Sequence, residues 1–253
     1  MSENLIIVSS AEQARERYSL SYSAGDFESP AEYGQQSRGV KTPSIVSGGD
    51  LARVVTSKEP GTLQAMRFGF TPHRSETCWD LLNKRSDTVS KSDDDSEYDR
   101  LMSIFMKPDF CEPITAFRCV VLVDAFLVTS PDNSYYLIHM RNKERPFALA
   151  GIYDHWKDPA TGEGSVGFTI LTAAPNAMLR RIGVDQMPVI LTQKNVLKWL
   201  DLKTDRRQYL PLIHTFPDNV MNGYPISGKV FSGQLTGQLL QPIGRILSPD
   251  PRG

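Results

Sequence analysis

Short apolar runs recur along the chain, and two of them bracket its most informative segment. Residues 168–172 (FTILT) form one run, and residues 187–191 (MPVIL) form the other. Both runs are typical of buried strands, and the residues between them predict a short helix that opens at Asn176. Residues 117–128 (FRCVVLVDAFLV) are apolar almost throughout. This pattern predicts a strand that is buried on both faces.

The remaining pattern predicts a strand-rich domain with few helices. Further strands are expected at residues 5–8, 43–46, 63–72, 135–140 and 147–156, and helices at residues 11–18, 98–105 and 192–200. In the last helix, Val196, Leu197, Trp199 and Leu200 are expected to pack inward. Residues 107–108 (KP) are expected to end the helix at 98–105.

The segments between these elements predict loops within one domain that covers residues 1–253. Residues 19–60 are rich in Ser, Gly, Pro and Asp and are assigned to long loops. The acidic run at 91–99 (KSDDDSEYD) predicts a solvated loop, and the tail at 248–253 is expected to be frayed. A chain of 253 residues is long enough to bury a substantial core.

Composition and charge narrow the classes of function. A formal net charge of -1 excludes a broadly basic protein that coats nucleic acid, so any polynucleotide site must be local. The 3 cysteines lack paired metal spacing, and the 4 histidines are scattered, so we expect no metal and no cofactor. The sequence shows neither a signal peptide nor an apolar run near twenty residues, which predicts a cytoplasmic protein without a membrane anchor.

Three motifs together resemble one family. Residues 82–88 (LNKRSDT), residues 117–126 (FRCVVLVDAF) and the stretch ILTAA-N followed by MPVIL are similar to motifs of the SRAP family, the SOS response-associated peptidase-like proteins. The resemblance runs over nearly the whole chain. It implies an α+β fold with a bifurcated mixed β-sheet whose barrel-like core is surrounded by helices.

The resemblance also implies a chemistry whose main residues are replaced here. In the family, a cysteine after the initiator methionine captures the aldehyde of an abasic site in single-stranded DNA, and a glutamate and a histidine move protons. The corresponding positions hold Ser2, Val128, and Val184 or Gly183. A serine hydroxyl is a much weaker nucleophile than a thiolate, and valine cannot transfer a proton.

Binding residues implied by the resemblance are better retained. Asn83 would face the reacting centre, and Arg85 would hold a phosphate, which a planar guanidinium does well. Thr172 would lie near the bound backbone, and Arg67 and Lys229 complete the expected DNA-binding set. A plainer reading of residues 82–88 is a helix-entry turn in which Asn83 caps and Arg85 is solvated.

Three functional hypotheses follow. The first is a catalytically degenerate SRAP-like protein, related to abasic-site sensing and crosslinking, that binds single-stranded or abasic DNA without a covalent bond. The second is a non-catalytic protein-interaction or structural module with an unknown protein partner. Three features favour this second hypothesis: the near-neutral charge, the acidic run at 91–99, and the sequence HRS at 73–75, where family members carry tryptophans that stack on DNA bases. The third is residual lyase or peptidase activity through the amine of Ser2.

Overall fold

The computed structural model describes residues 4–22, 44–85, 103–142, 144–232 and 235–247. Its strands are β1 (Asn4–Ile7), β2 (Ser21–Tyr22), β3 (Ser44–Val46), β4 (Leu51–Thr56), β5 (Thr62–Phe68), β6 (Asn83–Arg85), β7 (Arg118–Val123), β8 (Ala125–Thr129), β9 (Tyr135–Met140), β10 (Phe147–Lys157), β11 (Gly164–Ala173), β12 (Met187–Pro188), β13 (Ile190–Leu191) and β14 (Met221–Ile226). Its α-helices are α1 (Ala11–Tyr18), α3 (Pro108–Ala116), α4 (Ala177–Arg181), α5 (Gln193–Leu200) and α6 (Arg206–Tyr209). Single 3₁₀ turns are η2 (Ser103–Met106), η3 (Leu210–Leu212), η4 (Asp218–Val220) and η5 (Gly228–Phe231). This is the α+β architecture that the sequence predicts.

Five strands close into a small barrel. The strands pair in the ring β11-β10-β7-β4-β5, and the parallel contact of β5 with β11 closes it. Each of the five strands contributes to one apolar cluster inside the ring, for example through Val54, Met66, Val121, Leu149 and Ile170. Because side chains alternate along a strand, the neighbouring residues point outward. The barrel-like core expected from the sequence is confirmed.

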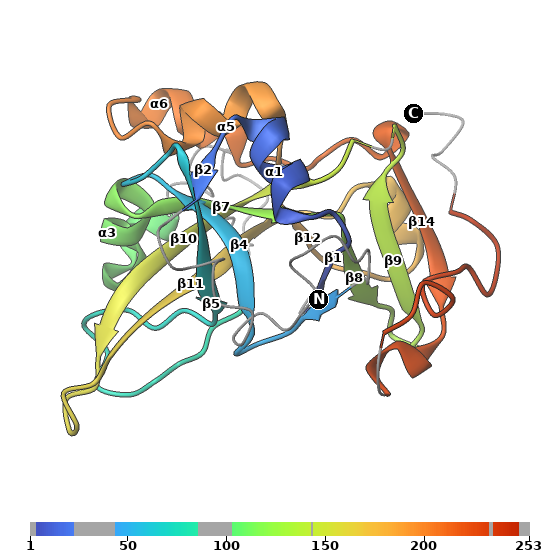
Figure 1. Cartoon of the computed structure of the whole chain (residues 1–253), viewed down its shortest axis with the longest axis horizontal. Helices are drawn as coiled ribbons and strands as arrows, with labels where there is room; N and C mark the ends of the chain where they lie inside the picture. The colour runs from blue at the N-terminus through green and yellow to red at the C-terminus, as the bar shows by residue number, and fades with distance from the viewer. Residues whose placement is uncertain (1–3, 23–43, 86–102, 143, 233–234, 248–253) are drawn as a thin grey trace.

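A second sheet continues from the barrel and makes the architecture bifurcated. It has the strand order β14-β9-β8-β1-β3, and the chain passes into it from β7 to β8 through Asp124. Figure 1 shows β9 and β14 on the side of the molecule away from α3. The interior cluster of the barrel extends to this sheet through Leu5, Phe126 and Ile138. The two sheets therefore share one core.

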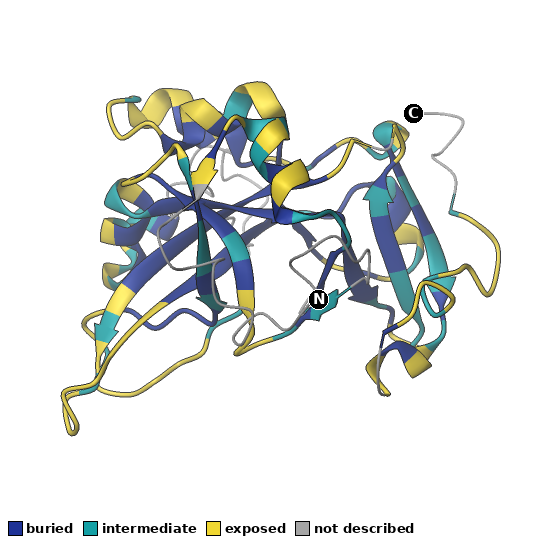
Figure 2. Ribbon diagram, in the orientation of Figure 1, coloured by how far each residue is buried: buried dark blue, intermediate teal, exposed yellow. Residues whose placement is uncertain are grey.

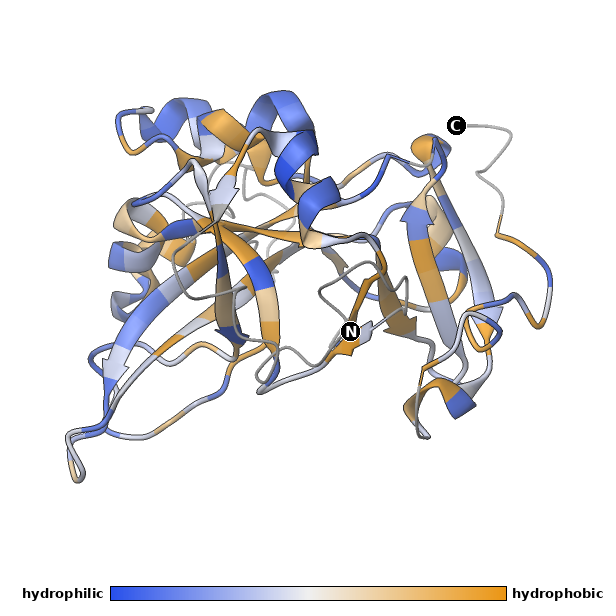
Figure 3. Cartoon of the chain, viewed as in Figure 1, coloured by the Kyte–Doolittle hydropathy of each residue, from blue (hydrophilic) through white to orange (hydrophobic). Residues whose placement is uncertain are grey.

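Helices cover the outside of the barrel. A second cluster joins outward residues of the barrel, such as Val120 and Leu171, to Phe110 of α3 and Trp199 of α5. A third, smaller cluster lies on the outer face of the second sheet and includes Val230 of η5. Figure 2 shows the strands buried and the outer helix faces exposed, and Figure 3 shows apolar residues concentrated along the same strands.

Between β5 and β6 the chain leaves the barrel, and it then returns to pair again with β11. Strand β5 pairs with β11 at Gly167 and Phe168, and β6 pairs with β11 from Ile170 onward. The excursion between them crosses directly over Gly167, where an added Cβ would lie 1.9 Å from the carbonyl oxygen of Gly69. Gly69 itself has a φ of +148°. This close backbone approach requires glycine at position 167.

Local signals explain the helix boundaries. Helix α1 begins after Ser10, which forms a capping box with Gln13. In the described part of the helix expected at 98–105, the 3₁₀ turn η2 ends at Met106, just before residues 107–108 as predicted, but Pro108 also begins a further helix, α3, that the sequence analysis did not predict. A proline is tolerated there, since the first backbone N–H groups of a helix have no partner within it.

Two other predictions need correction, and several fall outside the described residues. Residues 51–56, assigned to loops within 19–60, form β4 of the barrel. Leu197 is 69% exposed although it was expected to pack inward. The calls on Ser2, on the acidic run at 91–99 and on the tail at 248–253 lie outside the described residues. Among the helices in the described ranges, none is long and apolar enough to cross a membrane.

Candidate functional site

The candidate site is organised by the pairing of β6 with β11. The two strands are parallel, with Asn83 opposite Ile170 and Arg85 opposite Thr172. Paired residues in neighbouring strands present their side chains on the same face, and Ile170 belongs to the interior cluster. Asn83 and Thr172 therefore face the core between the two sheets, and the backbone of Arg85 occupies the adjoining register position.

Asn83 is a buried amide without a partner. Its side chain is 8% exposed, and neither Oδ1 nor Nδ2 has a hydrogen-bond partner in the described part of the chain. A free asparagine amide offers two donors and one acceptor. Leaving such a group buried and unpaired costs about 1–3 kcal/mol, and each exception in a native protein calls for an explanation. A ligand that supplies the missing partners is one such explanation.

Thr172 lies beside a second buried amide that the sequence analysis did not select as a site residue. Its hydroxyl donates to Oε1 of Gln186 at 2.6 Å, and Gln186 is 6% exposed. Gln186 stands immediately before β12, which pairs with β11 at Thr172 and Ala173. Its position next to the MPVIL stretch was the available sequence signal. The site thus combines two buried amides and a hydroxyl along one end of β11.

The positions that the resemblance assigns to proton transfer hold residues without a titratable group. Val128 is 0% exposed and Val184 is 4% exposed, and both belong to the interior cluster. Gly183, the other candidate for the histidine position, is exposed and has a φ of +74°, which strains any other residue there. The two valines fill the core where the family chemistry would need a carboxylate and an imidazole.

A buried carboxylate near this region fixes the N-terminal strand. Asp124 is 1% exposed, and its Oδ2 accepts hydrogen bonds from the backbone N–H groups of Val8 at 2.6 Å and Ser9 at 2.8 Å. Its Oδ1 accepts a hydrogen bond from the hydroxyl of Ser9. All of these partners follow β1. Asp124 therefore holds the end of β1 against the junction of β7 and β8.

The other two expected DNA-binding residues lie elsewhere. Arg67 alternates with Phe68, whose ring stacks on Phe168 inside the barrel with centroids 5.0 Å apart, so Arg67 points outward. Its guanidinium pairs with Asp80 at 2.5 Å, and this hydrogen bond lowers the pKa of Asp80. Lys229 is exposed on η5, beyond the outer face of the second sheet. The structure groups Asn83 and Thr172 but not Arg67 or Lys229.

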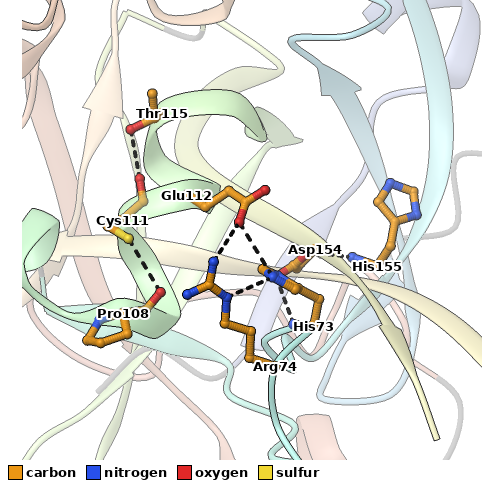
Figure 4. Close-up of polar contacts among 8 residues, drawn as sticks. All are labelled: His73, Arg74, Pro108, Cys111, Glu112, Thr115, Asp154 and His155. Carbon is orange, nitrogen blue, oxygen red and sulfur yellow. Dashed lines mark hydrogen bonds and ion pairs between the residues drawn. The ribbon is translucent and has the colours of Figure 1, made fainter.

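A polar cluster fixes the excursion between β5 and β6, where the sequence has histidine and arginine. Oδ2 of the buried Asp154 accepts from the backbone N–H of His73 at 2.9 Å and lies 2.9 Å from its Nδ1. Arg74 Nε donates to His73 Nε2 at 3.1 Å and faces Glu112 on α3. Figure 4 shows His73 between the two carboxylates. Trp79, later in the same excursion, is 44% exposed.

The chain is similar to proteins of one family. The model of the family described as SOS response associated peptidase (SRAP) matches residues 9–233. The chain is 27% identical over 196 residues to the abasic site processing protein YoqW of Bacillus subtilis, covering 75% of this chain and 80% of that protein. It is 30% identical over 195 residues to the abasic site processing protein HMCES of Xenopus tropicalis, covering 66% of this chain and 53% of that protein.

Solved structures show the same fold. The chain is similar to a crystal structure of a protein from Bacteroides thetaiotaomicron, with a TM-score of 0.75, 23% sequence identity, and coverage of 96% of this chain and 100% of that one. A structure from Bordetella bronchiseptica is similar at a TM-score of 0.62 and 16% identity, covering 90% of this chain and 100% of that one. At these identities the likeness concerns the fold.

Proposed function

Because the chain belongs to the SRAP family, as its match over residues 9–233 establishes, we propose that it is a catalytically degenerate member that binds single-stranded or abasic DNA without a covalent bond. The observation that carries this proposal is the buried, unpaired amide of Asn83. It is a binding group, held on a regular strand, that no described residue engages in a hydrogen bond.

The loss of catalysis rests on the two valines that stand at family positions for proton transfer, Val128 and Val184. A general acid or base contributes roughly 100- to 10,000-fold to a rate, and Val128 and Val184 supply neither. The relatives YoqW and HMCES are named as abasic site processing proteins. Binding of the same kind of DNA requires only the donors and acceptors of the site, so it survives the loss of proton transfer.

The decisive experiment uses a labelled single-stranded oligonucleotide with one abasic site, incubated with purified protein and run on native and denaturing gels. We expect a shifted band on the native gel and none on the denaturing gel. A denaturation-resistant adduct would refute catalytic degeneracy. No shift at low salt would refute DNA binding and favour the alternative, a non-catalytic interaction module that uses the fold.

Two variants connect binding to the site. Arg85→Ala should weaken binding and reduce the slope of log K against log salt by roughly 0.7, the value for one phosphate contact with a single strand. Lys229→Ala is the control, because it also removes one positive charge but lies on η5, outside the second sheet and away from β6. Equal effects of the two changes would mean that general electrostatics, rather than the site on β6, governs binding.

A further inference from the structure

A polar pocket lies on the outer side of the barrel, away from the interior that Asn83 faces. Its volume is about 480 Å³, and it opens between the C-terminal end of α3, the segment that follows α5, and α6. A volume of this size accommodates a small organic ligand. Apart from Leu202, its lining is polar or charged and consists of Thr115, Arg118, Thr204, Asp205, Arg206, Arg207 and Tyr209.

The floor of the pocket carries a buried positive charge. Arg118 is 1% exposed, and its guanidinium donates to the carbonyl oxygens of Trp199 at 2.6 Å and Asp201 at 2.9 Å. Two further bonds reach the carbonyls of Ile114 at 3.1 Å and Thr115 at 2.8 Å. All four acceptors lie at the C-terminal ends of α3 and α5, whose partial negative charges favour a cation.

No ion pair among the described residues includes this guanidinium. The carboxylate of Asp201 acts on Arg118 through its charge, without a direct ion pair. Burial lowers the pKa of Arg118, but arginine remains protonated under all ordinary conditions. The guanidinium also lies over the ring of Tyr209, 4.1 Å from its centroid. The floor therefore keeps a positive charge that backbone dipoles offset only in part.

The rim of the pocket adds two more guanidiniums and one carboxylate that already accepts a hydrogen bond. Arg206 lies over the ring of Phe105 at 5.2 Å from its centroid, which restrains its side chain. Arg207 is exposed. Asp205 is the only carboxylate in the lining, and its Oδ1 accepts the backbone N–H of Arg207 at 2.7 Å as the cap of α6. The lining thus has three guanidiniums against one carboxylate.

The charge of the surrounding segment has the same sign. Residues 193–209 contain five basic and two acidic residues, a net charge of +3, in a chain whose formal net charge is -1. The hydroxyls of Thr115 and Thr204 already donate to Cys111 O and Asp201 Oδ2, at 2.7 Å and 3.2 Å. Recognition of a ligand here falls to the guanidiniums.

We propose that this pocket binds a phosphate group, with Arg206 and Arg207 as its direct ligands and Arg118 as a fixed charge beneath it. Planar guanidiniums match the oxygens of phosphate in a bidentate manner. Two sources carry this group, namely the terminal phosphate of a mononucleotide and the internal phosphates of a nucleic acid strand. This site is separate from the one formed by Asn83 and Thr172.

The test measures binding of three probes by isothermal titration calorimetry at low salt. The probes are inorganic phosphate, thymidine monophosphate, and a short oligothymidine without terminal phosphates. The double variant Arg206→Gln/Arg207→Gln is compared with Lys194→Gln/Lys198→Gln, which removes the same charge from α5 outside the pocket. Circular dichroism and thermal melting establish that both variants are folded.

We expect the arginine variant to lose roughly ten-fold or more in affinity for at least one probe, and the lysine variant to change less than about two-fold. Loss of thymidine monophosphate binding alone identifies a terminal phosphate, and loss of oligothymidine binding alone identifies a strand. Equal losses in the two variants, or no binding of any probe by the wild type, overturn the proposal. Asn83→Val should leave the binding of inorganic phosphate and of thymidine monophosphate unchanged, whereas a loss of either would place them at the proposed DNA site and overturn the proposal.

Discussion

Replacing Asn83 by valine should stabilise the protein while it weakens DNA binding. The change removes an amide whose Oδ1 and Nδ2 are buried without partners and puts a β-branched residue, which suits a strand, into β6. Most substitutions of buried residues destabilise a protein. An increase in stability at this position would mean that the native sequence tolerates a cost for the sake of a ligand.

The magnitude follows from the burial of the amide. Asn83 is 8% exposed, so nearly the whole penalty of an unpaired amide, about 1–3 kcal/mol, is removed. The larger volume of valine costs part of this gain in a packed core. We therefore expect an increase of about 1–2 kcal/mol in the free energy of unfolding, and roughly a ten-fold loss in DNA affinity when the amide's hydrogen bonds are missing.

Urea unfolding followed by circular dichroism measures the first effect, and fluorescence anisotropy with an abasic oligonucleotide measures the second. Thr169→Val is a matched control, because the Thr169 hydroxyl is also buried without a partner and lies one residue from Ile170, on the opposite face of β11. It should stabilise the fold without changing DNA affinity. If Asn83→Val lowers the free energy of unfolding by more than about 1 kcal/mol, the amide is paired in the folded protein and the reasoning fails.

Three further predictions concern the fold. Arg118→Met should lower the free energy of unfolding, measured in urea titrations, by about 2–6 kcal/mol, because two buried carbonyls lose their donor at about 1–3 kcal/mol each. The control Arg207→Met should change the free energy of unfolding by less than about 0.5 kcal/mol. Gly167→Ala should lower the free energy of unfolding by more than about 3 kcal/mol or prevent folding, because its Cβ would lie 1.9 Å from a backbone oxygen. The control Gly61→Ala should leave the melting temperature nearly unchanged, because a Cβ there would meet nothing within 4 Å. Burial lowers the pKa of His139 below 6.5, so the unfolded state binds the proton more readily, and the free energy of unfolding should fall as the pH decreases below about 6.5. His139→Gln should flatten this pH dependence. The same pH profile in the variant and the wild type would contradict the prediction.

The sequence predicted most buried strands because their residues are apolar in runs or alternate. Residues 117–128 illustrate this success, since both β7 and β8 are buried almost throughout. It missed β4 because the preceding composition, rich in Ser, Gly and Pro, concealed the short run LARVVT. Leu197 was misplaced because Val196, Trp199 and Leu200 form the buried face of α5, and Leu197 lies about 100° around the helix from Val196.

The site was predictable only in its strand-bound part. Asn83 and Thr172 stand within motifs, and the parallel pairing of β6 with β11 brings them to one face. The outward direction of Arg67 depends on the closure of the barrel, which no local pattern records. The pocket around Arg118 was not predicted, because it depends on three helix ends that meet only in the folded chain.

The place of β1 between β3 and β8 has a consequence for synthesis of the chain on the ribosome. Leu5 lies opposite Val46 of β3, about 40 residues later, and opposite Phe126 of β8, about 120 residues later. The barrel closes later still, when β11 reaches β5. Pairings of such long sequence separation form slowly, because loop closure precedes the contacts that reward it. One edge of β1 can therefore pair with β3 early, while the edge that faces β8 stays open until β8 has been made.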